Sequence, residues 1–352
     1  AVAGVLNFIT RKDYEGFLTD VSFSSASPRQ TFTFSQLAGH RWETGSAMIA
    51  YEYNSTGQLR YGDRDRTRNA DLRYLGGSNF KNFNCSPASI STTIASTAQV
   101  YAYPYTGAPV AQANNSLAGT CSSSPTSTLL PSANTNTVFA TVTQDITDKL
   151  RARLDLNYAS RVNMNQQAQS AIVGYAYGPN GSSPALGTGS INPFYESNAA
   201  IGNSREYIRY DPTSLIGPSY NKTGIHSVSA NLNLTYQFGA DWEAEVNAYS
   251  GYAQSFIHNT NSVCGACALL ALNGTTNSEA LASNSLADTY GLGTLTSVTR
   301  VLNATNALDV WNPAASNRTP QQVINELRSD YRGSDINSDL NNVRLKFDGP
   351  LF

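Results

Sequence analysis

Charge and long apolar runs are both scarce in this chain of 352 residues. Asp, Glu, Lys and Arg make up only 14% of it, and the mean hydropathy is -0.32. The longest apolar runs are short pieces such as residues 268–272, well below the ~18 residues that a membrane-spanning helix needs. A helical membrane protein is therefore excluded, and the 40% apolar content excludes a disordered chain.

Signals for nucleic-acid binding, catalysis and metal binding are also missing. The net charge is -2 and the pI is near 6.0, so the chain has no electrostatic footprint for nucleic acid. It contains no nucleophile elbow, phosphate-binding loop or dinucleotide fingerprint. The three histidines, His40, His226 and His258, lie in different segments. We expect no enzymatic activity, no cofactor and no metal site.

Asn, Ser, Thr, Gly and 20 Tyr take the place of the missing charges. This mixture is typical of a sheet with one apolar face, one polar face and long uncharged loops, because Tyr tolerates both lipid and headgroup surroundings. Residues 226–238 show the pattern best, since Val228, Leu232 and Leu234 alternate with Ser and Asn. Eight such strands are predicted, at 16–25, 30–39, 45–55, 137–145, 151–161, 226–238, 243–255 and 341–348.

Loop lengths decide which medium surrounds this predicted sheet, because periodicity alone does not show which face is wet. Short turns alternate with very long connections, at about 56–136, 162–225 and 256–340. Outer-membrane barrels have short turns on one side and long loops outside, whereas a compact soluble domain rarely carries three such loops. The sequence therefore predicts an all-β antiparallel transmembrane barrel segment. Aromatic residues near the strand ends are expected to form interfacial girdles: Trp42, Tyr53, Tyr158, Tyr236, Phe238, Trp242 and Tyr252.

The four cysteines fall into two polar regions, Cys85 with Cys121 and Cys264 with Cys267. Pairing within each region is the simplest of the three possible connectivities, and it implies an oxidising compartment. Cys264 and Cys267 are spaced like a redox motif, but no βαβ pattern surrounds them, so we favour a loop staple over thiol chemistry or metal binding.

Two further features of the loops are candidates for function or packing. A helix is predicted over 319–328, as an element packed over the barrel mouth. Five loop tyrosines could stack on a sugar or siderophore, or pack the long loops against one another. They are Tyr101, Tyr103, Tyr105, Tyr175 and Tyr177.

The opening segment, AVAGVLNFITRKD, resembles the end of the plug in the TonB-dependent receptor family of outer-membrane transporters. The family pattern A-x-x-G-V-x-N-x-I-T-[RK] is met by Ala1, Gly4, Val5, Asn7, Ile9, Thr10 and Arg11. The resemblance implies that residues 1–13 are the last strand of a plug domain and 14–352 the first part of a barrel of about 22 strands. The chain has neither an initiator Met nor a charged leader, so we expect a fragment.

The resemblance implies energised uptake across the bacterial outer membrane without catalysis. The ligand would be scarce, such as a ferric siderophore, a vitamin or an oligosaccharide, and TonB would pair by strand addition with a coupling box outside this fragment. Polar strand residues, Arg153, Asp155, Asn231, Asn233, Glu243, Glu245, Arg344 and Lys346, would line the lumen. Two alternatives remain: a complete eight-strand barrel with a structural or adhesive role, and a secreted β-rich carbohydrate-binding protein or enzyme.

Overall fold

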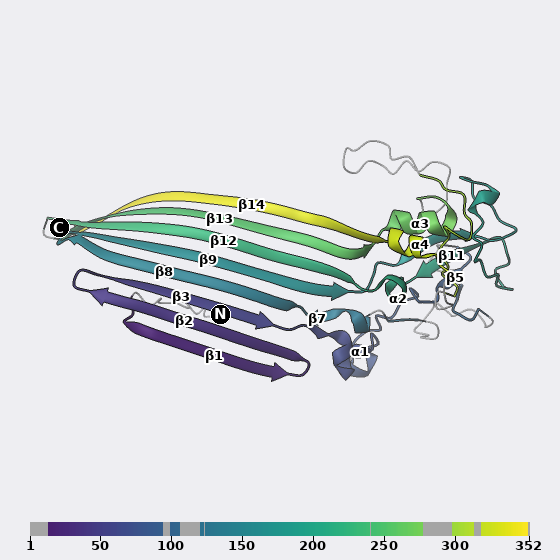
Figure 1. Cartoon of the computed structure of the whole chain (residues 1–352), viewed down its shortest axis with the longest axis horizontal. Coiled ribbons are helices and arrows are strands. Elements are labelled where there is room, and N and C mark those ends of the chain that lie inside the picture. Colours follow the sequence, from purple (N-terminus) through teal and green to yellow (C-terminus); the bar gives the residue numbers. More distant parts are fainter. Residues whose placement is uncertain are drawn as a thin grey trace.

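An eight-stranded antiparallel sheet dominates the computed structural model, which describes residues 13–93, 99–105, 120–122, 124–239, 241–276, 298–312 and 318–350. Its strand order is β1-β2-β3-β8-β9-β12-β13-β14, and all of its strands run along the long axis of the molecule (Figure 1). The strands are β1 (Gly16–Ala26), β2 (Arg29–Trp42), β3 (Gly45–Thr56), β8 (Ser132–Thr147), β9 (Leu150–Gln167), β12 (Ser219–Phe238), β13 (Trp242–Val263) and β14 (Arg328–Asp348).

These are the eight strands expected from the period-two pattern, so the all-β antiparallel prediction is confirmed. Several strands run further toward the long connections than the pattern indicated. The largest difference is in β14, which begins at Arg328 instead of residue 341 and pairs with β13 along nearly its whole length. Residues 328–340 are mostly polar on both faces, and backbone hydrogen bonds hold such a segment in the sheet without any apolar alternation.

Pairing registers separate the side chains of the sheet into two faces. Leu154 lies opposite Val142 on one side and Leu232 on the other, and Leu232 lies opposite Ala248. Since successive side chains point to opposite faces of a strand, the intervening polar residues all fall on the other side. We call the first side the apolar face and the second side the polar face.

The three long connections are shorter than predicted, at 57–131, 168–218 and 264–327, because the strands are longer. Together they form a cap at one end of the sheet (Figure 1). Its sheets contain β10 (Ile172–Tyr177), β11 (Arg205–Tyr210), β5 (Ser89–Ser91) and β6 (Val100–Tyr101), and separately β4 (Leu59–Arg60) with β7 (Thr128–Leu130). Its helices are α1 (Asp65–Arg68), α2 (Thr213–Ile216), α3 (Gly265–Asn273) and α4 (Gln321–Glu326), with 3-10 turns η1 (Tyr61–Asp63), η2 (Arg73–Leu75), η3 (Ser124–Thr126) and η4 (Thr188–Ser190).

The cap has a hydrophobic core of its own. Ile90 comes from the first connection, Ile208 from the second, and Leu272, Leu308 and Trp311 from the third; all five are completely buried. Each such side chain contributes roughly 1.5–3 kcal/mol by leaving water. The three connections therefore form one packed unit.

Two helices contribute to this core. The prediction of a helix over 319–328 is confirmed by the shorter α4, which buries Val323 and has Leu327 buried at its end. Helix α3 was not predicted, and it turns residues 268–272 into part of the core. Gly274 ends α3 with a left-handed φ of 79°, where a Cβ would lie 2.6 Å from the carbonyl oxygen of Arg300.

Buried side-chain amides fasten the cap together and join it to the sheet. The Nδ2 of Asn192 donates to the carbonyl oxygens of Leu272 and Leu308, both at 3.0 Å. The Nε2 of Gln169 donates to the carbonyls of Gly217 at 2.8 Å and Asn261 at 2.6 Å, and its Oε1 accepts from the amide of Val263 at 2.9 Å. Gln169 thereby ties the second connection to the end of β13.

Replacing Gln169 with Ala should loosen the cap, because two carbonyls and one amide lose their partner in a water-poor site. We expect the free energy of cap opening, measured by native-state hydrogen exchange of residues 213–217 and 261–263, to fall by about 3 kcal/mol. Gln167→Ala is the matched control, since that side chain is exposed. Equal protection in the two variants would contradict this role for Gln169.

Candidate functional site

The apolar face of the sheet is open along its length. Leu232 is 40% exposed and Leu345 is 65% exposed, while Leu234 and Val246 are half-buried by their own neighbours in the sheet. Within the described part of the chain, no second layer of protein covers these side chains. Soluble proteins rarely leave apolar surfaces of this extent uncovered, so this face is the leading candidate for a functional surface.

Aromatic side chains border the apolar face at both ends. At the short-turn end, Phe238 stacks on Tyr236 and Trp242 with ring centroids 6.3 Å apart, and Trp42 donates from Nε1 to Gln144. Ten residues further along β13, Tyr252 lies in the same row as Val228 and Tyr158. Ten residues span about 33 Å along a strand. At the strand tilt of membrane barrels this corresponds to about 25 Å along the membrane normal, which equals the height of the apolar band of such barrels.

The polar face carries a network of charged and amide groups. The Oδ1 of Asp155 accepts from Nε of Arg153 at 2.8 Å and from Oγ1 of Thr141 at 2.6 Å. The Oε1 of Glu245 accepts from Nδ2 of Asn233 at 2.7 Å and from Arg344 at 3.4 Å. Five of the residues expected to line a lumen thus lie on one face, in two hydrogen-bonded groups. A hollow of about 550 Å³ beside them is lined by Phe139, Arg153, Asp155, Asn157, Asn231, Asn247, Tyr249, Leu340 and Asn342.

The two outer strands of the sheet have free edges among the described residues. Strand β1 pairs only with β2, and β14 pairs only with β13, so the sheet does not close on itself. A complete eight-strand barrel would join β1 to β14. Edges of this length leave rows of backbone N–H and C=O groups open for pairing with another strand.

The loop tyrosines are mostly packing residues. Tyr101, Tyr105, Tyr175 and Tyr177 are all at most 8% exposed, and only Tyr103 is well exposed, at 48%. Tyr105 packs in the cap core and donates to the carbonyl of Ala88, while Tyr175 and Tyr177 pack with Tyr207 on the other face of the small sheet. This arrangement favours the packing alternative over ligand stacking for the four buried rings.

Both disulfides have the pairing expected from the sequence. Cys85 is bonded to Cys121, and Cys264 to Cys267. The second pair does not staple an irregular loop, however, because Cys264 is the N-cap residue of α3 and Cys267 lies in its first turn. The expected motif at the end of a plug, Ala1 to Arg11, lies outside the described residues.

A buried carboxyl group lies at the centre of the cap. Glu206 on β11 is completely buried, and its Oε2 accepts a hydrogen bond from Nε1 of Trp311 at 2.7 Å. Asp309 is also fully buried and faces Arg318, whose Nη1 contacts Glu196 at 3.0 Å. Burial raises the pKa of Glu206 to about 8, against the hydrogen bonds that lower it. Sequence reasoning missed this group, because Glu206 sits in a connection with no recognisable motif.

Nothing in the described residues forms a metal site, since they contain no group of three or more His, Cys, Asp or Glu placed to hold an ion. The structure does bring two of the histidines together. The ring of His226 stacks on the ring of Phe256 with centroids 5.6 Å apart, and the ring centroid of His258 lies 4.9 Å from that of Phe256. His40 lies elsewhere and contacts Glu15 at 3.1 Å.

Comparisons with known proteins add no assignment: no family model, no curated protein and no solved structure matches the chain. None of the helices in its described part is long and apolar enough to span a membrane.

The stability of the cap should depend on pH through Glu206. Its folded-state pKa of about 8 lies above the ordinary value of 4.5, so the folded cap binds a proton that the unfolded chain releases. This contribution is complete below about pH 4.5 and is lost as the pH rises toward 8. We expect the melting temperature of the cap to fall over this window, and Glu206→Gln to remove most of the fall.

Fluorescence of Trp311 measures this transition in a background with Trp42→Phe and Trp242→Phe, which removes the other two tryptophans. Glu52→Gln, at an exposed position on β3, is the control and should keep the full dependence on pH. A wild-type cap whose melting temperature is constant from pH 5 to pH 8 would contradict the buried, protonated carboxyl group.

Proposed function

We propose that this chain is part of the wall of an outer-membrane transporter of the TonB-dependent receptor type, which takes up a scarce ligand without catalysis. The observation that carries the proposal is the open apolar face, because hydrocarbon is the medium in which such a face is stable. The aromatic rows at its two ends, such as Trp242 and Tyr252, have the positions and chemistry of interfacial girdles.

The free edges support a wall that is larger than this sheet. In the proposed barrel, β1 and β14 pair with further strands, which removes both edges. The alternative of a complete eight-strand barrel lacks the pairing of β1 with β14 that it needs. Under the proposal, the polar face with Arg153, Asp155 and Glu245 lines the lumen and contacts the plug.

The cap supports an external position for the long connections. Two disulfides fit an oxidising compartment, and a packed core keeps the connections folded beyond the membrane surface. The proposed ligand is a ferric siderophore, a vitamin or an oligosaccharide, bound by outer surfaces of the loops and the plug. TonB is the proposed energy-coupling partner.

Arginine at Leu232 tests the membrane part of the proposal. This side chain lies near the middle of the apolar face, and a charge there should lower the stability of the inserted barrel by about 2–4 kcal/mol. Asn231→Arg, at the preceding residue and on the polar face, should lower the stability of the inserted barrel by much less. Reversible folding of the full-length protein into lipid vesicles gives both values, and equal effects of the two arginines would contradict lipid contact.

Uptake by intact cells tests the transport part. Cells that make the full-length protein should accumulate a labelled iron chelate or oligosaccharide, and a protonophore should abolish accumulation while surface binding remains. Cells from which the gene is deleted are the control, because they show how much of the label other transporters take up. Accumulation that is unchanged by the protonophore would contradict energised import.

A further inference from the structure

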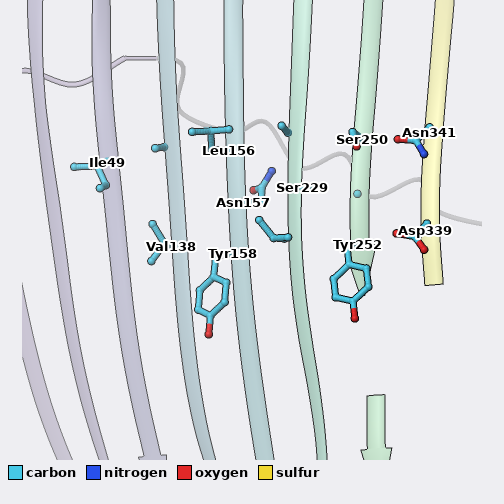
Figure 2. A pocket seen from close by; sticks show the side chains of 14 residues that line it. Ile49, Val138, Leu156, Asn157, Tyr158, Ser229, Ser250, Tyr252, Asp339 and Asn341 are labelled. Atoms are coloured by element: carbon cyan, nitrogen blue, oxygen red, sulfur yellow. The ribbon is translucent and has the colours of Figure 1, made fainter. Parts of the chain in front are cut away.

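A hollow of about 550 Å³ crosses the apolar face close to its cap-side border (Figure 2). It runs from β3 to β14, over five inter-strand spacings, or roughly 24 Å. None of the residues that line it is Lys or Arg. It belongs to neither the lumen side nor the cap, so ligand import does not account for it.

The hollow follows a row in which small side chains flank Leu156. Ala140, Ala230 and Ser250 lie in this row across the sheet, with Leu156 between Ala140 and Ala230. The rows on either side are bulkier. Toward the cap the row is Val138, Tyr158, Val228 and Tyr252, and toward the short turns it is Val142, Leu154, Leu232 and Ala248.

The floor is apolar at one end of the hollow and polar at the other. Ile49 is 50% exposed and Leu156 is 45% exposed at the apolar end. On β13 and β14 the lining changes to Ser250, Asn341 and Asp339, which Figure 2 shows on neighbouring strands. A site of this kind fits an amphipathic molecule lying across the strands.

Asp339 determines what the polar end can accept. Its carboxylate shares the apolar face with Tyr252 and Asn341, and it has no ion pair among the described residues. A carboxylate at the border of a hydrocarbon layer is unfavourable unless a cation or hydrogen-bond donors reach it. The complementary group is therefore a cation that also donates hydrogen bonds.

We propose that this hollow binds one molecule of a lipid that carries a primary ammonium on its head group. The ammonium lies against Asp339 and Asn341, and one acyl chain lies along Ala230, Leu156 and Ala140. The site rests on the proposed function, because it needs the apolar face to be in a membrane. It makes this part of the wall a specific lipid site within a surface of general lipid contact.

Native mass spectrometry of the full-length protein in detergent tests the site, with phosphatidylethanolamine as the probe. Phosphatidylcholine, whose quaternary ammonium has no N–H, and phosphatidylglycerol, which has no ammonium, are the comparison lipids. We expect phosphatidylethanolamine to bind about tenfold more tightly than either, as one charge-assisted interaction allows.

Two variants locate the binding. Asp339→Asn should remove the preference for phosphatidylethanolamine, and Ala230→Leu should weaken binding of that lipid about tenfold by filling the hollow. Their controls are Asp348→Asn, at the C-terminal end of β14 and outside the hollow, and Ala248→Leu, one row outside the hollow on the same face. Both controls should bind phosphatidylethanolamine like the wild type.

The outcomes separate this inference from the proposed function. Equal binding of the three lipids, or a preference that survives Asp339→Asn, overturns the lipid site while membrane insertion remains intact. A protein that does not insert into vesicles at all overturns the proposed function as well. Insertion is measured on every variant in the same preparation, so a loss of fold is recognised before binding is compared.

Discussion

The apolar side chains on one face of the eight-stranded sheet have no protein above them in the described part of the chain, and the medium that covers this face determines where the sheet is stable. Leu232, Val343 and Leu345 are well exposed in a sheet whose registers place all of them on one side. Water is a poor medium for a surface of this size. The proposed hydrocarbon layer would account for the open face, the aromatic rows at its borders and the polar opposite face together.

The fold of the cap depends on a different balance, between the cost of ordering long connections and the gain from burying their side chains. Its connections are too long to remain folded by their turns alone, and they gain stability by sharing one core that includes Trp311 and Ile208. Buried amides such as Gln169 and Asn192 satisfy backbone groups where connections meet. Because those groups are internal, the cap presents a preformed surface above the sheet instead of three independent loops.

Sequence periodicity was sufficient to locate the strands whose two faces differ chemically. It identified 226–238 and 243–255 with their faces, because Leu, Val and Ala alternate there with Asn, Glu and Ser. It failed for residues 328–340, where pairing with β13 supplies the order and the side chains give no signal. It also missed α3 and the buried Glu206, since both depend on contacts between connections that are distant in the chain.

Contact of β12 with lipid can be measured residue by residue. Spin labels placed one at a time from 226 to 238 in the vesicle-inserted, full-length protein report access to oxygen, which enters lipid, and to a water-soluble nickel complex. We expect high oxygen access at the even positions, including Val228, Ala230 and Leu232, and low oxygen access at Asn231 and Asn233. High nickel access at the even positions, or the same accessibility at even and odd positions, would contradict it.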